Sequence, residues 1–401
     1  MAPQHVVVIG AGIIGAAVAR ALTLTAESPT VTVLEKEGSP AAHQTSHNSG
    51  VVHAGLYYVP ESAKARSVRA GVTALRAYCL DHGLAYQEVG KVLVACDSDD
   101  EHRLHDIHLR AEANGVPGLR WLTPDQLGEV EPHVVGRAAL HSPSTAIVDY
   151  SQITAALLAE AAERTATVTT DFEVTSIAVG ERTQVTAKDG RTVLADLVVA
   201  AGGLNADRLA TLAGDSPFPR IVPFRGEFHE LRPSARHLVS GLVYPVPDPR
   251  YPFLGVHLTR RVDGAVLMGP NAVLALSREG YRLRDVDARQ VRELLGFKGF
   301  RSFAGANVAT GASEVWTSIN RRAFIARARR YVPAISPSDV GRGPTGVRAQ
   351  AMDADGSLVD DFRFSRVGNV FSIRNAPSPA ATASLAIADR IVRELGMEPA
   401  P

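Results

Sequence analysis

The chain has 401 residues, of which 45% are hydrophobic and 21% charged, so it can bury a sizeable core in one or two closely joined domains. Its 42 Lys and Arg residues balance its 42 Asp and Glu residues, which excludes a broad basic field for nucleic acid or for an anionic membrane. The two cysteines, Cys79 and Cys96, have no metal-ligand spacing and predict neither a metal site nor a disulfide framework. We therefore expect a reduced, cytoplasmic setting.

Residues 1–5 lead directly into an apolar strand and leave no room for a secretory signal. No uninterrupted apolar run approaches the roughly 18 residues that span a bilayer. The sequence predicts a soluble protein, or at most a peripheral one on the cytoplasmic face of a membrane.

The first elements form a βαβ unit. A strand of β-branched residues at 6–9 is followed by a glycine turn, a helix over 13–25 and a second strand at 30–34. This order predicts a parallel sheet with a right-handed crossover. A polar stretch at 38–55 then leads to a helix over 61–82, a strand at 91–95, a helix over 99–114 and a helix that begins at Pro124.

The middle of the chain returns to strands. A helix over 149–162 precedes strands at 167–170 and 174–179, a hairpin that turns at Asp189-Gly190, and an apolar strand at 197–201 typical of a sheet buried on both faces. Strands with one covered face follow at 222–231, 243–246, 255–259 and 265–268, then helices over 287–295 and 314–331. The chain closes with 341–350, a strand at 370–373 and a helix over 379–395. The layout predicts two interleaved domains.

A dinucleotide site is indicated by the glycine turn. Gly10-Ala11-Gly12-Ile13-Ile14-Gly15 fits G-x-G-x-x-G between a strand and a helix, where the turn and the helix N-terminus can hold a pyrophosphate. Glu35, 20 residues after Gly15 at the end of the second strand, can accept hydrogen bonds from ribose hydroxyls. It argues against a 2′-phosphate, although Lys36 beside it weakens that point. The fingerprint alone leaves NAD and FAD open.

The polar stretch at 43–58 favours FAD. Its small residues and hydrogen-bond donors suit a backbone that passes close to the second, larger part of an extended cofactor. The candidate contacts within it are Thr45, Ser46, His47, Asn48, Ser49 and Gly50.

With these residues in place, the chain resembles the L-2-hydroxyglutarate oxidase/dehydrogenase family of the D-amino-acid-oxidase-like FAD superfamily, almost from end to end. The blocks that carry the resemblance are His47 to Tyr58 (HNSGVVHAGLYY), Val222 to Phe228 (VPFRGEF), Tyr244 to Arg250 (YPVPDPR), Gly255 to Thr259 (GVHLT), Gly343 to Gln350 (GPTGVRAQ) and Asn375 to Thr382 (NAPSPAAT).

The resemblance implies an α/β fold, α+β overall, in which a Rossmann-like FAD-binding domain with a parallel sheet is interleaved with a largely antiparallel substrate-binding domain. We assign residues 1–89, 146–216 and 337–401 to the first domain and 90–145 and 217–336 to the second. It also implies that Val174 contacts the adenine side, that Ala201-Gly202 passes near the pyrophosphate, and that Gly346 and Arg348 contact the cofactor. Residues Ser378, Pro379, Ala380, Ala381 and Thr382 are expected to bring a helix N-terminus to the flavin, where its partial positive charge stabilises the reduced ring.

The activity that the resemblance implies is oxidation of L-2-hydroxyglutarate to 2-oxoglutarate, with hydride transfer from C2 to N5 of the flavin. Oxygen, a quinone or another electron carrier remain open as acceptor, and a quinone or electron-transport acceptor is expected. An amino-acid or sarcosine-type amine oxidase of the same superfamily is the alternative. A scaffold that binds nucleotide without catalysis would not explain the histidines and arginines considered next.

Such a reaction needs a base, and histidine is the natural candidate because its ordinary pKa is about 6.5. His53, in the predicted flavin bed, is the first candidate, and His257, in a strand of the substrate domain, is the second. Either could instead only hold backbone or flavin by hydrogen bonds. His47 could contact the flavin or be attached to it.

A dicarboxylate also needs cationic or donor groups on both sides of the reacting carbon. Arg225 and Arg348 lie in apolar or glycine-rich surroundings that are unusual for a surface arginine, and Tyr58 and Lys64 could complete the clamp. An interdomain salt bridge is the other interpretation of each arginine, and a solvated helix face is that of Lys64.

The segment 294–303 mixes aromatic and basic residues. It could lie on a membrane surface and bring the reduced flavin to a quinone, or Phe297, Phe300 and Phe303, spaced by three, could pack into the core.

Overall fold

The computed structural model describes residues 4–248 and 255–398. Met1 to Pro3, the last two residues of the block at 244–250 (Pro249 and Arg250) and residues 399–401 lie outside the described residues.

The N-terminal βαβ unit forms the centre of a six-stranded sheet. All neighbouring strands in it are parallel except β20 and β21, which pair antiparallel. In spatial order the strands are β20 (Arg363–Val367), β21 (Val370–Asn375), β13 (Leu197–Ala200), β1 (His5–Ile9), β2 (Thr30–Leu34) and β9 (Ala166–Thr169).

Both faces of this sheet are covered, which explains why its central strands are apolar without interruption. On β1, Val6 and Val8 pack in one core cluster with the helices, whereas Val7 and Ile9 pack in another on the opposite face. The helices on the first face are α1 (Ile13–Thr23), α5 (Tyr150–Ala162), α11 (Ser384–Glu394) and α2 (Ala63–Asp81). The second face carries β10 (Val174–Ala178), β11 (Thr183–Ala187), β12 (Thr192–Ala195) and α6 (Ala206–Leu212), whereas η1 (Gly203–Asn205) contacts β14 (Arg220–Leu231) and β19 (Val340–Met352).

A second, nine-stranded sheet is mostly antiparallel, the one parallel pair among its described strands being β15 with β5. Its order is β18 (Val273–Leu274), β14 (Arg220–Leu231), β17 (Val266–Gly269), β16 (His257–Arg260), β15 (Leu242–Pro245), β5 (Lys91–Ala95), β7 (Ala138–Ser142) and β6 (Arg120–Leu122), with β19 (Val340–Met352) on β14. The remaining elements around it are α3 (Ser98–Ala113), α4 (Pro124–Val130), η2 (Pro233–Leu238), η3 (Pro337–Asp339) and a small sheet of β3 (Val51–Val52), β8 (Ala146–Val148) and β4 (Tyr86–Glu88).

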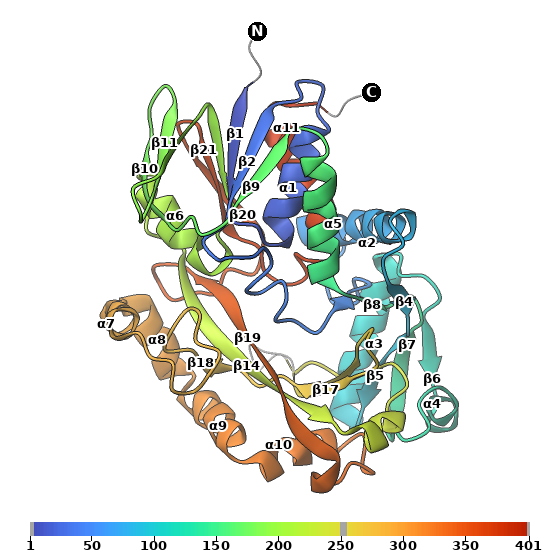
Figure 1. Ribbon diagram of the computed structural model, residues 1–401. Helices are drawn as coiled ribbons and strands as arrows, with labels where there is room; N and C mark the ends of the chain where they lie inside the picture. The colour runs from blue at the N-terminus through green and yellow to red at the C-terminus, as the bar shows by residue number, and fades with distance from the viewer. Residues whose placement is uncertain (1–3, 249–254, 399–401) are drawn as a thin grey trace.

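The long pair β14 and β19 runs from the junction of the two sheets to the far edge of the molecule (Figure 1). Eleven register pairs join them, from Arg220–Met352 to Leu231–Val340. The predicted fold class, a parallel Rossmann-like sheet combined with a largely antiparallel one, is confirmed.

Four helices lie outside β18 and β14 (Figure 1), and their bounds correct one prediction. They are α7 (Ala288–Gly296), α8 (Lys298–Ala306), α9 (Val308–Ile319) and α10 (Arg321–Ala328). The single helix expected over 314–331 is therefore two helices that meet at Asn320, whose side chain caps the second by accepting from the Ala323 N–H. Among the described residues, no helix is long and apolar enough to cross a membrane.

The core interpretation holds for the aromatic residues of segment 294–303. Phe297 and Phe300 are buried in a cluster with Phe224, and Phe303 packs partly against it. The aromatic side chains of this segment are therefore not available to a membrane surface.

Candidate cofactor and substrate site

One cavity of about 1340 Å³ lies at the junction of the two sheets. Its walls come from the β1–α1 turn, the polar stretch 41–58, strands β14 and β19, the segment 270–297 and the turn before α11. A cavity of this size and composition suits an extended dinucleotide with a small substrate at one end.

The glycine turn has the geometry that a pyrophosphate requires. Gly10 has φ +106°, and a Cβ there would stand 2.5 Å from the Ala201 carbonyl oxygen. A Cβ on Gly12 would meet only Thr45 Oγ1, at 3.2 Å, so the backbone at Gly12 is open on its cavity side. At the N-terminus of α1, beside this opening, the Ile13 N–H donates to Thr45 Oγ1 at 3.0 Å. The N–H groups of Ile14 and Gly15, which line the cavity, are therefore the donors that fit a bound dinucleotide phosphate.

Glu35 stands at the end of β2, as predicted, and faces the cavity. Its Oε2 accepts from the Ala11 N–H at 2.8 Å and its Oε1 from the Glu37 N–H at 3.0 Å, which fixes the carboxylate at the rim of the turn. Each oxygen retains capacity for a ribose hydroxyl.

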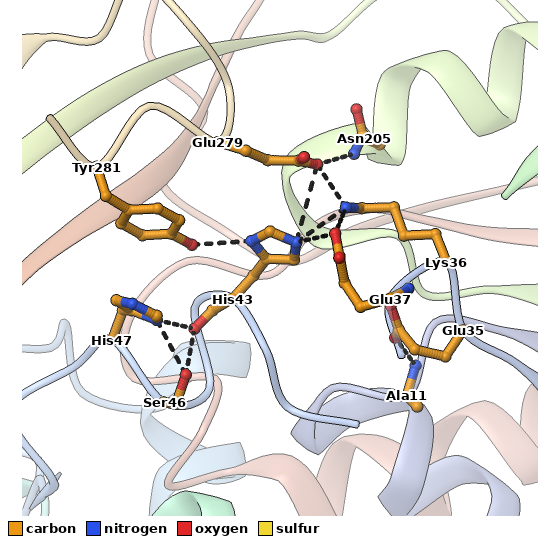
Figure 2. A network of polar contacts seen from close by, with 10 residues as sticks. All are labelled: Ala11, Glu35, Lys36, Glu37, His43, Ser46, His47, Asn205, Glu279 and Tyr281. Atoms are coloured by element: carbon orange, nitrogen blue, oxygen red, sulfur yellow. Dashed lines mark hydrogen bonds and ion pairs between the residues drawn. The ribbon is translucent and has the colours of Figure 1, made fainter. Parts of the chain in front are cut away.

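A polar network beside Glu35 joins the two halves of the chain, as Figure 2 shows. Lys36 Nζ lies 2.9 Å from His43 Nε2 and 2.9 Å from Glu279 Oε1, and it also contacts Glu37. Burial lowers the pKa of Lys36, but its hydrogen bonds to Glu37 and Glu279 outweigh burial and raise it. Glu37, His43 and Glu279 are close enough to hold a metal ion, yet the ammonium of Lys36 already supplies the positive charge among them.

Most residues predicted to bind the cofactor come together in this cavity. Its lining includes Gly10, Gly12, Ile14, Gly15, Glu35, Lys36, Thr45, His47, Asn48, Ser49, Val174, Ala201, Gly202, Gly346, Arg348 and Ser378 to Thr382. Ser46 and Gly50 are not part of the lining. The Ser46 side chain is exposed and contacts His47 Nδ1 at 2.9 Å, and the Gly50 carbonyl accepts from the Val148 N–H at 2.8 Å.

The turn before α11 differs from its prediction. Residues 378–383 form turns, and α11 begins only at Ser384, so Ser378 to Thr382 line the cavity as a turn and not as the first residues of a helix. Thr382 Oγ1 accepts from the His53 N–H at 3.2 Å and contacts the Tyr150 hydroxyl at 3.1 Å. The turn thus positions the backbone of His53.

Two histidines, His53 and His257, line the cavity. His257 stacks on Tyr244 with ring centroids 3.9 Å apart, and its Nδ1 lies 2.9 Å from the Gly255 carbonyl oxygen. Because a carbonyl can only accept, Nδ1 carries the proton and Nε2 of the neutral ring carries a lone pair.

Both histidines are neutral at physiological pH. Burial, followed by the charges of Lys91 and Lys64, lowers the pKa of His53 to about 3. Burial also lowers the pKa of His257 to about 3, with Lys91 and Arg348 among the contributing charges. Burial lowers the pKa of Arg348 as well, and this arginine lines the cavity beside the histidines.

Two predicted substrate contacts do not reach the cavity. Arg225 alternates with Gly226 on β14, so when Gly226 faces the cavity the arginine faces the opposite side, where it is buried against Glu227 with the closest N–O distance 3.2 Å. Lys64 is neither solvated nor in the lining. It is buried and donates to the Asp360 carbonyl at 2.9 Å and carboxylate at 3.0 Å. Tyr58, in contrast, does line the cavity.

The sequence-based prediction missed Tyr57, Tyr244 and Lys91. Tyr57 and Tyr244 belong to the quoted blocks and line the cavity, but nothing in their spacing distinguished them from core residues. Lys91 begins an apolar strand, a place where a lysine usually reaches solvent, yet it is only 2% exposed.

Comparison with known proteins gives concordant findings. The family model described as "FAD dependent oxidoreductase" matches residues 5–394. The chain is 42% identical to the mitochondrial L-2-hydroxyglutarate dehydrogenase of Bos taurus, over 97% of this chain and 88% of that protein. It is 40% identical to the L-2-hydroxyglutarate dehydrogenase of Escherichia coli K12, over 97% of this chain and 92% of that protein.

Solved structures support the fold. The chain superposes on L-alpha-glycerophosphate oxidase from Mycoplasma pneumoniae with TM-score 0.79 at 22% identity, covering 100% of this chain and 97% of the other. Glycine oxidase from Geobacillus kaustophilus gives TM-score 0.72 at 19% identity, covering 98% and 94%.

Proposed function

This chain belongs to the FAD dependent oxidoreductase family, and from that premise we propose that it oxidises L-2-hydroxyglutarate to 2-oxoglutarate with FAD as cofactor. The observation that carries the proposal is that one cavity is lined both by a dinucleotide turn and by two neutral histidines with Arg348. Two relatives that are 40–42% identical to this chain over nearly its whole length are named for this activity.

FAD, when bound, supplies the electron acceptor, taking a hydride from C2 of the substrate at N5. The glycine turn and Glu35 would hold its pyrophosphate and ribose, and residues 45–49 and 378–382 would line its flavin end. The division into a cofactor domain (1–89, 146–216, 337–401) and a substrate domain (90–145, 217–336) is part of this proposal. β19, assigned to the cofactor domain, pairs with β14 of the substrate domain and brings Arg348 to the substrate.

The chain's own residues bind the anion and take the proton. Arg348 would pair with one carboxylate of the substrate, with Tyr58 as a donor beside it. His53 is the first candidate for the base that removes the hydroxyl proton, and His257 the second. A histidine with a pKa near 3 is a weak base, but a bound dianion favours the imidazolium and so raises that pKa during catalysis.

Anaerobic mixing of the purified protein with L-2-hydroxyglutarate, followed at the flavin band, tests the reaction. Bleaching with this isomer but not with D-2-hydroxyglutarate or sarcosine is expected. A yellow protein that stays oxidised with L-2-hydroxyglutarate would refute the substrate, and bleaching by sarcosine or glycine alone would establish an amine oxidase instead.

The same assay on two variants assigns the base. His53→Ala should abolish flavin reduction while FAD stays bound, and near-normal reduction would transfer the role to His257. His257→Ala is the companion variant, because among the described residues its ring nitrogens hydrogen-bond the Gly255 carbonyl and do not hold the 51–58 segment.

We further propose that the electrons pass to a membrane quinone and that α9, not the aromatic part of 294–303, makes the membrane contact. α9 exposes Trp316 (56%) and Ile319 (66%), with Val308 and Val315 on the same helix. The exposed charged residues between 282 and 322 are mostly basic: Arg282, Arg284, Arg289, Arg292, Lys298, Arg301, Arg321 and Arg322. Glu293, whose side chain is 39% exposed, pairs with Arg289 and offsets part of this charge. Apolar side chains flanked by positive charge match an anionic lipid surface, which would put the protein at the cytoplasmic face of a membrane.

Vesicle sedimentation tests this contact. The protein should sediment with vesicles that contain phosphatidylglycerol and not with pure phosphatidylcholine, and Trp316→Ser with Ile319→Ser should abolish sedimentation. Leu109→Ser, which removes an apolar side chain of 53% exposure from α3, is the matched control and should have no effect. Equal sedimentation of all three proteins would refute the contact.

A further inference from the structure

A dicarboxylate needs recognition at both ends, and the cavity lacks two of the groups predicted to provide it. Arg225 and Lys64 do not line the cavity, and they pair with Glu227 and Asp360. Arg348 accounts for one carboxylate in the proposed function. Of the other arginines in the lining, Arg208, Arg278, Arg289 and Arg374 pair with acidic side chains, and Arg220 lies over the rings of Phe218 and Phe297. A cation near Arg348 that has no acidic partner is therefore the candidate for the second carboxylate.

Lys91 is a cation of that kind. It is the first residue of β5, inside the large sheet, and only 2% of it is exposed. Its Nζ lies 2.8 Å from the Tyr57 hydroxyl and 3.8 Å from the centroid of the Tyr244 ring. In the described part of the chain no carboxylate acts on its pKa, for which burial is the one cause, and the void beside it has no room for water.

An ammonium buried in this way lacks both hydration and a counter-ion, which is costly. Burial lowers the pKa of Lys91 to about 7, as expected for a group that has no negative partner. A positive charge on Lys91 in these surroundings is explained if an anionic ligand binds nearby when the protein functions. Lys91 does not itself line the cavity, so its effect must pass through the wall in front of it.

Tyr57 is that wall. A lysine nitrogen in the ammonium form can only donate, so the Tyr57 oxygen accepts from Lys91 and its own hydrogen is available to another acceptor. Burial raises the pKa of Tyr57 well above its ordinary value, so the phenol remains a donor. Tyr57 lines the cavity together with His53, His257 and Arg348.

We infer that Tyr57, held and polarised by Lys91, is the second carboxylate-binding element of the substrate site. Tyr57 donates its hydroxyl hydrogen to the carboxylate, and Lys91 is a positioning residue that supplies positive charge from behind. The inference rests on the proposed function in that the ligand is a small dicarboxylate. It extends that function by naming the groups that distinguish a dicarboxylate from a monocarboxylate.

The test measures binding, without turnover, on the FAD-loaded protein. Glutarate has both carboxylates but no hydroxyl to oxidise, and its dissociation constant can be followed by the change in flavin absorbance. Butyrate, with one carboxylate, is the comparison ligand. Lys91→Met and Tyr57→Phe should each weaken glutarate binding by about tenfold or more, the usual effect of losing a hydrogen bond to a charged group, and should change butyrate binding less.

Coupling distinguishes positioning from general damage. The double variant should bind glutarate within about twofold of the weaker single variant, because Lys91 acts through Tyr57. Losses that multiply, or unchanged glutarate affinity in either single variant, would overturn the inference. Tyr331→Phe is the matched control. It removes the buried hydroxyl bonded to the Val256 carbonyl in the same half of the molecule, and should leave glutarate affinity unchanged.

Stability separates the outcomes further. Lys91→Met replaces an unpaired buried charge with an apolar side chain of similar length, so its thermal midpoint should equal or exceed that of the wild type. If Lys91→Met did not fold, Tyr57→Phe, which removes one oxygen atom, would decide alone. Wild-type protein that binds glutarate but does not oxidise L-2-hydroxyglutarate would refute the proposed function and leave this inference standing. Wild-type turnover with normal glutarate binding in both variants would refute the inference alone.

Discussion

The three glycines of the dinucleotide turn should respond to alanine substitution in different ways, because a Cβ meets different surroundings at each. At Gly15 it would stand 1.9 Å from the Gly10 carbonyl oxygen, roughly 1.5 Å short of ordinary contact. At Gly10 it would stand 2.5 Å from the Ala201 carbonyl oxygen, on a residue with φ +106°. At Gly12 it would meet only Thr45 Oγ1, at 3.2 Å, and φ there is an ordinary −76°.

These distances predict the order in which the three substitutions lower the free energy of unfolding. Gly15→Ala must push α1 away from the β1 turn, against a core packed by α5 and α11, and we expect a loss of about 3 kcal/mol or more in the free energy of unfolding. Gly10→Ala adds backbone strain of about 1–2 kcal/mol to its contact with Ala201. Gly12→Ala should cost less than about 1 kcal/mol, because a threonine side chain can yield by a few tenths of an ångström.

Cofactor retention should follow a different order. The methyl group of Gly12→Ala occupies the open side of the turn, where a pyrophosphate approaches, so this variant should be folded yet hold FAD at least about tenfold more weakly. Urea unfolding of the apoprotein and titration of the apoprotein with FAD measure the two quantities separately. A Gly15→Ala protein with wild-type stability, or a Gly12→Ala protein with wild-type FAD affinity, would refute the reasoning.

Three further perturbations have definite signs. Because burial lowers the pKa of His257 to about 3 from an ordinary 6.5, the unfolded chain takes up a proton that the folded chain does not, so stability should fall as the pH drops from about 6.5 towards 3. His257→Asn should reduce that slope by about 1.4 kcal/mol per pH unit in urea unfolding at pH 5–6, and an unchanged slope would argue against a neutral buried ring. Asp215→Ala should destabilise the protein by about 3 kcal/mol, since it leaves Arg374, which is 2% exposed and 2.6 Å from Asp215 Oδ2, without a counter-charge; a small change in thermal midpoint would contradict this. Phe300→Ala should cost about 3 kcal/mol by opening a cavity under α8, whereas the same change at a membrane-facing residue would leave urea unfolding unaltered.

Local rules predicted the geometry of the glycine turn and of Glu35 well. The G-x-G-x-x-G turn and Glu35 lie close together in sequence, and the βαβ unit that carries them is determined by short-range pattern and handedness. The observed contact of Glu35 with the Ala11 N–H is a direct consequence of adjacent parallel strands. Those parts of the site needed no knowledge of distant packing.

The substrate half depends on which face of a strand points where, and alternation alone does not decide this. The sequence alone does not tell whether Arg225 or Gly226 faces the cavity. The register of β14 on β19 turns the glycine to the cavity and the arginine away from it. Lys91 was missed because its burial results from a neighbour across the sheet, β15, some 150 residues later in the chain, which brings Tyr244 over the lysine. The end of one helix at Ile319 and the start of the next at Arg321 were missed because Asn320 caps only one turn, a weak local signal within an otherwise helical run.

The walls of the cavity come from residues near both ends of the chain, and this has a consequence for how the protein is made. Gly10 and Gly12 are synthesised well before the turn at 378–382, which bonds the His53 backbone, and before strand β21, which pairs with β13 two places from β1. While the ribosome is still translating, the glycine turn therefore has no flavin pocket to join. If residues 378–382 line the flavin, cofactor capture must wait until they too have emerged, so FAD would bind a chain in which the segments 10–15 and 378–382 have both been made.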